Sequence, residues 1–453
     1  MKFQLSFFLL LVAGAAMAQP KLNSPYSRYG IGDPVNQFFA AQAGFGGQSA
    51  AFHDPFHLNL VNPASYAHLR ATTLDVGLFA KNSKYQSSES SLNNWSGNLA
   101  YLALGFPLRS PINEVLDRTK SPWQYGMGIA LTPNSLVGYN VETRDTVPGM
   151  PELGEVQNTF EGSGGTYRFT WSNAVKYKRT AFGLNLGWIF GKNTFENETL
   201  FGDGLTWGDS FPTFNNNYRD DIRLSGFTWN LGLQHDLVLR YAQNDKETPT
   251  RWITIGLTGE GKHNINSTAD RIFLRSRGRL SNGQYQNADT LLFETGAPYT
   301  ITLPATFSLG LQYVIANKLR IGGQYRYEGW SAFKNEARPE NIRYRNSSAF
   351  SAGIEFIPDY ASYNKYLKRI RLRAGGYYRQ DPRIIDGEGL DDTGLTLGLG
   401  FPLVLPRQQT SYVNAALEVG KLGAGSPVEE TYFRITVGFT LNDNSWFYKR
   451  RFE

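Results

Sequence analysis

Four arginines are placed where they could bind a carboxylate. Arg320 and Arg326 alternate with apolar residues in one segment, and Arg371 and Arg373 do so in another. Successive side chains of a strand point to opposite faces, so all four should share the face away from the apolar residues. A guanidinium in a site of low dielectric binds carboxylates strongly, which makes Arg320, Arg326 and Arg373 candidate ligand-binding residues.

A purely structural role for these arginines is the main alternative. Four acidic residues fall on the same face by the same counting: Asp75, Glu328, Glu355 and Glu418. Buried charges are usually paired, so an ion-pair ladder would account for most of the four arginines.

A second group of candidate ligand-binding residues is aromatic and lies near the N-terminus: Phe38, Phe39, Phe45, Phe52 and Phe56. Pockets for small molecules are mostly apolar, with a few polar groups that fix the orientation of the ligand. These phenylalanines could therefore line such a pocket. They could equally pack their own segment against a surrounding wall.

Motifs for other chemistry are weak. His53 and His57 have the spacing of metal ligands on a helix, but Pro55 lies between them and would break that helix. Acidic turns at 203–209 and 386–392 have oxygen ligands suited to calcium, yet solvated turns look the same. The chain has no cysteine and its basic residues form no stripe. We therefore expect no metal, no cofactor, no nucleic acid and no enzymatic activity.

The elements that position these residues are alternating strands. In residues 182–190 an aromatic or aliphatic side chain stands at every second position, with mostly small or polar residues between. A closed barrel in lipid needs this pattern, because its outer face is apolar and its lumen is polar. Fourteen segments have this character: 72–80, 97–106, 123–132, 166–177, 181–191, 222–236, 251–263, 306–315, 319–328, 347–357, 370–379, 393–401, 411–420 and 431–441.

The sequence thus predicts an all-β fold, a transmembrane antiparallel barrel of about fourteen strands. An even count is typical of bacterial barrels. Residues 135–143 could add a strand, and residues 265–305 are ambiguous. Tight connections at 178–180 and 316–318 should lie at one end, and long polar loops at 192–221, 263–305 and 329–346 at the other.

The N-terminal region is different in character. Residues 1–18 have a positive start, an apolar run and an Ala-Met-Ala end, which is typical of a signal peptide. Residues 19–70 are rich in Gly, Ala, Asn and Pro, so we expect a hatch packed inside the lumen, with a flexible tail as the alternative. Residues 71–453 would form the barrel. An exported barrel belongs in the outer membrane of a Gram-negative bacterium.

Three motifs resemble the FadL family of outer-membrane transporters for hydrophobic compounds. Asn-Pro-Ala at 62–64 is similar to the end of that family's hatch. Leu-Pro-Ala-Thr at 303–306, with Trp-Ser-Ala-Phe at 330–333, resembles its middle region. Residues 372–382 and 397–401 look like its late hairpin. The same broad family contains the secretion-associated protein PorV.

This resemblance implies a fourteen-stranded barrel with a hatch, and uptake of small hydrophobic molecules such as long-chain fatty acids. The molecule would leave sideways into the membrane, which requires an irregular strand because a perfect ladder has no exit. The expected partners are outer-membrane lipid and a hydrophobic ligand. The alternative, following PorV, is a barrel that serves as a scaffold or shuttle subunit in an outer-membrane secretion or assembly complex.

Overall fold

We analysed a computed structural model of the chain. It describes residues 24–88, 90–109, 121–146, 155–201, 214–243, 245–276, 278–279, 285–286, 289–339, 342–385, 387–405 and 409–444. The predicted signal peptide and the acidic turn at 203–209 lie outside these residues.

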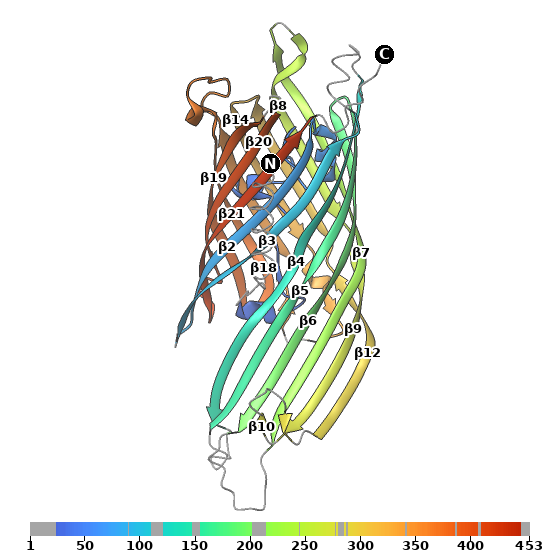
Figure 1. The fold of residues 1–453 in the computed structure, drawn as a ribbon, viewed down its shortest axis with the longest axis vertical. Coiled ribbons are helices and arrows are strands. Elements are labelled where there is room, and N and C mark those ends of the chain that lie inside the picture. Colours follow the sequence, from blue (N-terminus) through green and yellow to red (C-terminus); the bar gives the residue numbers. More distant parts are fainter. Residues whose placement is uncertain are drawn as a thin grey trace, which may run out of the picture.

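Fourteen antiparallel strands close into one barrel (Figure 1). Going round the ring, the strands are β2 (Thr72–Gln86), β3 (Ser91–Pro107), β4 (Trp123–Thr146), β5 (Glu155–Tyr177), β6 (Thr180–Phe201), β7 (Asn215–Ala242), β8 (Asp245–Glu260), β13 (Thr306–Ile315), β14 (Leu319–Glu328), β17 (Ser347–Phe356), β18 (Arg371–Ile385), β19 (Glu388–Leu405), β20 (Gln409–Leu422) and β21 (Glu429–Asp443). β21 pairs with β2 and closes the ring. Each predicted segment overlaps one of these strands, so the predicted fold class is confirmed.

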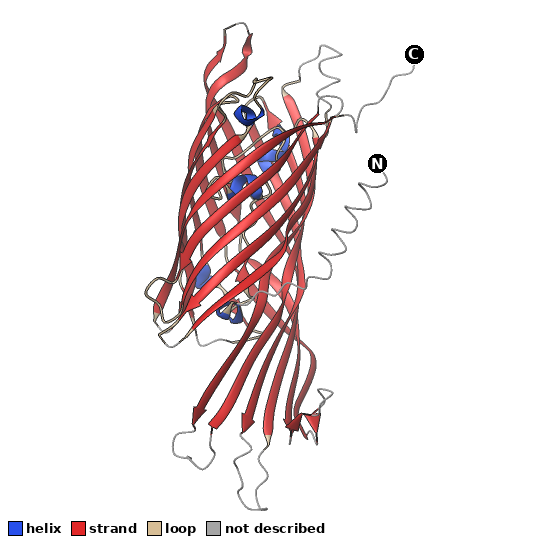
Figure 2. Cartoon of the chain, turned by 60° about the vertical axis from the view of Figure 1, so that its left-hand side comes forward, coloured by secondary structure: helices blue, strands red, loops and turns tan. Residues whose placement is uncertain are grey.

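The two ends of the barrel differ. The connections β5–β6 and β13–β14 are tight and lie at one end, which we call the turn end. At the other, extended end, strands β4 to β7 run on past the rest of the wall (Figures 1 and 2). A hairpin of β9 (His263–Ser276) and β12 (Asp289–Leu303) continues this sheet beside β7.

The extension corrects the predicted loops. Residues 192–221 are not a long loop, because β6 runs to Phe201 and β7 begins at Asn215. Residues 263–305 are mostly the β9–β12 hairpin, and residues 135–143 are the outer part of β4 rather than a further strand. The predicted loop 329–346 contains η4 (Trp330–Ala332), β15 (Lys334–Asn335) and β16 (Arg343–Tyr344). The remaining short elements are β10 (Gly278–Arg279), β11 (Tyr285–Gln286) and η5 (Tyr366–Arg369).

Side chains alternate across the wall as predicted. Trp188, Leu231 and Leu311 point outward and are about half exposed, at 48%, 52% and 50%. Their strand neighbours Asn185 and Gln312 point inward and are buried. An apolar outer face and a polar inner face are what a barrel in lipid requires.

Residues 24–70 lie inside the barrel (Figure 2). They contain η1 (Pro25–Arg28), β1 (Asp33–Pro34), α2 (Ala40–Ala43) and η2 (Pro63–His68), and we call them the hatch. Among the described residues, no helix has the length and apolar character needed to cross a membrane. The hatch contributes most of the largest fully buried side chains.

Inward-facing glycines make room for the hatch. A Cβ on Gly126 of β4 would lie 1.9 Å from the carbonyl oxygen of Tyr66, and one on Gly256 of β8 would lie 2.0 Å from that of Ala50. A glycine within a strand often marks the close approach of another backbone. Gly126 and Gly256 therefore serve the hatch, whereas others, such as Gly187 beside Thr228 of β7, serve packing within the wall.

Candidate functional site: a split in the wall and two cavities

One seam of the barrel is incomplete. β3 and β4 pair only between residues 102–107 and 126–131. Toward the extended end the two strands diverge, β3 pairing with β2 and β4 with β5 (Figure 1). β3 carries a bulge at Ala100 and β4 an irregularity at Asn134, so both strands are irregular where their ladder ends.

The split begins inside the apolar band. Leu102, at the last pair of the seam, is 41% exposed, and further along β3 the exposed Trp95 packs edge-on against Phe433 of β21. Aromatic residues of this kind mark the interface of a barrel with the lipid headgroups. The part of the split between Leu102 and Trp95 therefore faces lipid.

The hatch fills the place that β3 leaves at the edge of β4. In β1, Asp33 lies opposite Leu136 in the register of an antiparallel pair. The backbone N–H of Val35 donates to the carbonyl of Asn134 at 3.0 Å, and that of Ser24 donates to Gly138 at 2.8 Å. Unpaired backbone groups are costly in lipid, so this segment satisfies an edge that the wall leaves open. We call residues 24–37 the sealing segment.

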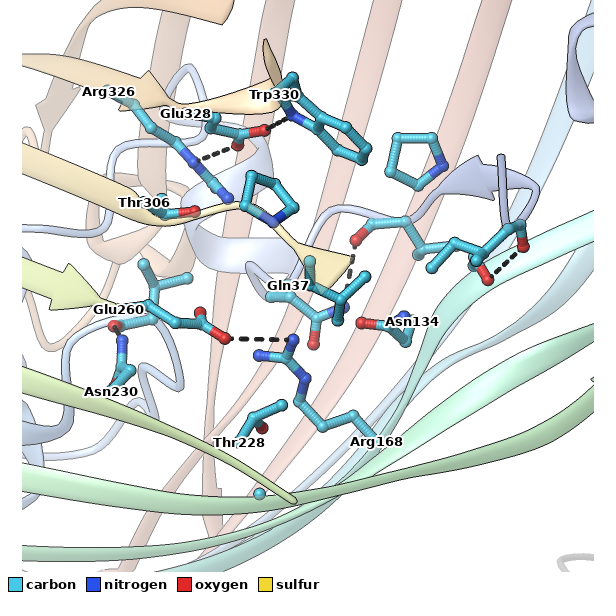
Figure 3. A pocket seen from close by; sticks show the side chains of 18 of the residues that line it. Gln37, Asn134, Arg168, Thr228, Asn230, Glu260, Thr306, Arg326, Glu328 and Trp330 are labelled. Atoms are coloured by element: carbon cyan, nitrogen blue, oxygen red, sulfur yellow. Dashed lines mark hydrogen bonds and ion pairs between the residues drawn. The ribbon is translucent and has the colours of Figure 1, made fainter. Parts of the chain in front are cut away.

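Behind the sealing segment lies a cavity of about 180 Å³, the outer cavity (Figure 3). Hatch residues 29–32, 34, 35 and 37 line it, together with Asn134 and Ser135 of β4. Its apolar lining includes Ile31, Val35, Leu60, Trp229, Leu303 and Trp330. A dry apolar cavity of about 150 Å³ is enough to hold benzene, so this one fits a single small apolar molecule.

The charges in the outer cavity are paired. Arg326 contacts Glu328 at 2.7 Å, and Arg168 contacts Glu260 at 3.5 Å (Figure 3). The indole N–H of Trp330 donates to Glu328 at 2.6 Å. Because these charges neutralise each other, the cavity has no need of a charged ligand. Its lining suits an uncharged ligand with at most a few polar atoms.

A second and larger cavity of about 760 Å³ opens at the turn end, and we call it the turn-end cavity. Hatch residues 53–56 and Arg70 form one side of it, and the β5–β6 and β13–β14 turns lie at its rim. Arg371 of β18 binds Asp54 at 2.8 Å, and Arg320 donates to the carbonyl of His53 at 3.1 Å. These contacts anchor the hatch at this end.

Two ionisable groups of the hatch are shifted by this environment. Burial alone would raise the pKa of Asp54, but the guanidinium of Arg371 and the ring of His57 hold it well below its usual range. Burial, with His53 and the ammonium of Lys176 nearby, lowers the pKa of His68 well below its usual value. Asp54 is therefore ionised and His68 neutral at pH 7.

The five candidate phenylalanines do not form one pocket. Phe39, Phe45 and Phe52 are fully buried, and Phe39 stacks on Tyr101 of β3 at 4.1 Å between ring centroids. Phe38 is half-buried, with its ring beside Gly47. Phe56 is the only one of the five that lines a described cavity, and that cavity is at the turn end. Their contacts are those of hatch packing, and a role in ligand binding stays a prediction.

The candidate arginines, like the phenylalanines, do not lie together in one site. Arg373 binds Glu355 at 2.6 Å and Asn414 at 2.9 Å, deep in the wall. Arg320 faces the turn-end cavity, whereas Arg326 faces the outer one. Arg326 and Arg373 thus form the ion pairs of the structural alternative, with Glu328 and Glu355. The ladder does not extend to Asp75, which accepts a hydrogen bond from Thr440, or to Glu418, which accepts one from Tyr377.

The roles of three residues were not identified from the sequence. Arg383 of β18 binds Asp33 at 2.6 Å and so fixes β1 of the sealing segment. Arg168 lies inward in the outer cavity, which its alternation with Tyr167 and Phe169 could have indicated. The amide of Asn62 donates to the carbonyls of Leu233 and Leu257, both at 3.3 Å. These bonds attach Asn62, the N-cap of η2, to the wall strands β7 and β8.

The acidic turn at 386–392 is part of the structure rather than an open oxygen cluster. Asp391 contacts Arg345 at 2.5 Å, and Asp392 contacts Arg379 at 2.6 Å. Asp386 lies outside the described residues. The carboxylates at 391 and 392 are engaged by cations, which is the pattern of a structural turn.

The fold defines a class: transmembrane barrels with an internal hatch, a fold that is similar to solved structures of the FadL type. The Ralstonia pickettii toluene transporter TbuX matches with TM-score 0.53 and 14% identity, over 90% of this chain and 99% of that one. The CymD monoaromatic hydrocarbon channel matches with TM-score 0.52 and 14% identity, over 91% and 98%. A Pseudomonas aeruginosa FadL homologue matches with TM-score 0.52 and 16% identity, over 91% and 99%. At these identities the likeness shows the fold, and it confirms the predicted resemblance.

A comparison with models of protein families identifies the family of this chain. The BamG family model matches residues 1–453, and the chain belongs to that family. No curated protein matches the sequence. The solved structures above are channels, transporters or FadL homologues by name, in agreement with the prediction that the protein is not an enzyme.

Proposed function

We propose that the protein is an outer-membrane channel for the uptake of small hydrophobic molecules. One observation carries this proposal: the sealing segment lies between the outer cavity and the split. Residues 33–35 pair with the free edge of β4, and hatch residues 29–32, 34, 35 and 37 line the cavity behind it. Displacement of this short segment would join the cavity to the lipid through the split.

The outer cavity favours a small and uncharged cargo. Its volume of about 180 Å³ is suited to one aromatic ring with short substituents, and its charges are already paired. TbuX and CymD are named for toluene and monoaromatic hydrocarbons. We therefore place monoaromatic compounds ahead of long-chain fatty acids as the substrate class.

Bromobenzene is a direct probe of this proposal. Crystals of the protein soaked with bromobenzene should show an anomalous bromine peak in the outer cavity or in the split between β3 and β4. A Leu60→Trp variant, which fills the cavity, should lose the peak while the barrel stays folded. Peaks confined to the lipid-facing wall would contradict the proposal.

The extension favours a second candidate function, a scaffold in an outer-membrane complex. Phe293 on β12 is 67% exposed, although its strand lies beyond the closed part of the wall. Uptake by a channel does not require this sheet. Gentle detergent extraction should then recover a stoichiometric partner that is lost when Phe293→Arg is introduced, and a monomer with normal uptake would exclude this candidate.

A further inference from the structure

The inner face of the extension holds a further cavity, of about 440 Å³, which we call the extension cavity. Residues of β4, β6, β7, β9 and β12 line it, together with residues 337–339, which follow β15. The extension lies at the end opposite the tight turns (Figure 1). Tight turns lie on the periplasmic side of bacterial barrels, so this cavity is on the side of the cell exterior.

One row of side chains across the sheet supplies much of the lining. Neighbouring strands place directly opposed residues in this row, which runs in the order Tyr139, Gly162, Phe195, Asp220, Arg271 and Glu294. The Cβ atoms of directly opposed residues are about 5 Å apart, so the register itself makes these side chains neighbours. One half of the row is aromatic and the other half is charged.

The aromatic half presents ring surface to the cavity. A Cβ on Gly162 would lie 2.2 Å from the ring of Tyr139, so this ring lies against the sheet where no side chain stands. Tyr218, two residues before Asp220 on the same face of β7, also lines the cavity. It meets Phe273 edge-on at 6.3 Å, and no ring of the described residues is stacked on it.

Asp220, in the charged half, lacks a hydrogen-bond donor. It is only 3% exposed, and its Oδ1 accepts no hydrogen bond from the described part of the chain. Nε of Arg271 lies 3.5 Å away, and burial raises the pKa of Asp220 to about 6. The Nη groups of Arg271 donate elsewhere, to Glu294 at 3.0 Å, to the hydroxyl of Tyr299 at 2.6 Å and to the carbonyl of Ala337. A buried carboxylate oxygen without a donor is costly, so the cavity suits a ligand that supplies one.

The charges near Asp220 favour an uncharged ligand. Arg271 and Arg338 both line the cavity and would repel an ammonium group. The carboxylates of Glu196 and Glu294 line it as well and would repel an anion. The donor should therefore be a hydroxyl group, on a molecule that also has an apolar surface for the aromatic rings. A sugar ring has both, because its hydroxyls donate and accept while its C–H groups form an apolar face.

We propose that the extension cavity binds a saccharide, with sugar hydroxyls at Asp220 and Glu294 and one sugar face on Tyr218. Asp220 and Glu294 both contact Arg271, so one or two sugar units can reach both carboxylates. The site is separate from the outer cavity and the split, and it does not depend on the proposed transport. The saccharide could be a free sugar or the sugar part of a surface glycolipid, since both present the same hydroxyls.

Saturation-transfer NMR on the full-length protein tests the proposal. The detergent is octyl tetraoxyethylene, which has no sugar head group. The probes are the methyl glycosides of glucose, galactose, mannose, rhamnose and N-acetylglucosamine, with maltose and cellobiose. At least one probe should bind with a dissociation constant below about 10 mM, and cyclohexanol, with one hydroxyl, should bind roughly tenfold more weakly. Asp220→Ala should weaken the binding of the best probe about tenfold, because it removes the unpaired acceptor.

Asp221→Ala is the matched control. Asp221 is on the opposite face of β7 and contacts Lys192 at 2.9 Å, so this variant should bind as the wild type does. Tyr218→Ala tests the aromatic surface independently of Asp220 and should also lose binding, whereas Tyr218→Phe should keep it. Each variant is used only if its mobility shifts on boiling, which shows a folded barrel.

Three results would overturn the proposal: no probe bound by the wild type, phenol or spermidine bound as tightly as the best saccharide, or equal binding in Asp220→Ala and Asp221→Ala. Native mass spectrometry in the same detergent then identifies the source of the sugar. A glycolipid retained by the wild type and lost from Asp220→Ala identifies a surface glycolipid, whereas saccharide binding without a retained glycolipid identifies a free sugar.

Discussion

The two ends of the barrel wall satisfy the backbone hydrogen bonds of β4 in different ways. Toward the turn end every strand pairs with its neighbour, and the seam of β3 and β4 is continuous from residue 102 to 107. Toward the extended end that seam opens, and β4 pairs with the hatch instead of with β3. A ladder of strands is permanent, whereas a contact with a short internal segment can be exchanged. The difference indicates where the barrel is built to open.

Removing the hatch should give the largest effect, because it removes the seal and the lumen filling together. We expect a barrel of residues 71–453 to fold, since its ladder closes without the hatch. It should then conduct ions in planar bilayers, where we expect the full-length protein to be silent. A truncated barrel that shifts in mobility on boiling yet stays silent would show that side chains or loops of the wall close the lumen.

A charge introduced on the outer face should have a different effect on stability in the lipid-facing wall than in the extension. Leu311→Arg, on β13, should destabilise the barrel by about 2–4 kcal/mol if it lies near the middle of the bilayer. Phe293→Arg, on β12 of the extension, which we expect to lie in water, should change stability by less than about 0.5 kcal/mol. Equal costs in urea unfolding from vesicles would place both residues in the same environment.

Filling the space used by the hatch backbone should have an intermediate effect. Gly126→Val places a side chain against the carbonyl of Tyr66 and should cost about 1–3 kcal/mol, with the hatch becoming sensitive to protease. Gly323→Val is the control, because a Cβ there has its nearest neighbour at 3.7 Å. If both variants resist protease alike, the glycines do not serve the hatch.

Acidification should give the smallest effect. His68 is neutral in the folded protein because burial and the nearby His53 and Lys176 lower its pKa, although Asp236 opposes this shift. Its contribution to stability is therefore complete above pH 6.5 and is lost as the pH falls below 6.5. We expect protease access to the hatch to rise between pH 7.5 and pH 5, and less so in His68→Gln. A flat profile in the wild type would contradict this assignment.

The alternation of side chains was enough to predict the strands and their faces, because a closed wall between lipid and lumen imposes it at every position. Asn185 and Leu231 illustrate this. The extension was missed because its strands, such as 192–201, leave the lipid and lose the apolar outer face. The Asn, Thr and Glu residues of such a segment are typical of a loop, so the sequence predicted a loop there.

The candidate site was harder to predict than the fold. The phenylalanines suggested a ligand pocket, but an aromatic side chain packs a hatch and lines a cavity with the same chemistry. The split depends on which strands fail to pair between residues 91–101 and 132–146. The split is therefore a joint property of β3, β4 and the sealing segment. The sequence of any one of these segments does not reveal it.

A disulfide that locks the sealing segment tests the central claim most directly. Asp33 and Leu136 face each other in register, and the chain has no native cysteine to interfere. In liposomes, uptake of labelled toluene through the Asp33→Cys, Leu136→Cys variant should fall at least tenfold when oxidised and recover on reduction. The control pair Ala415→Cys, Val437→Cys, in the continuous seam of β20 and β21, should transport normally in both states. Undiminished uptake through the oxidised lock would show that molecules do not pass between β3 and β4.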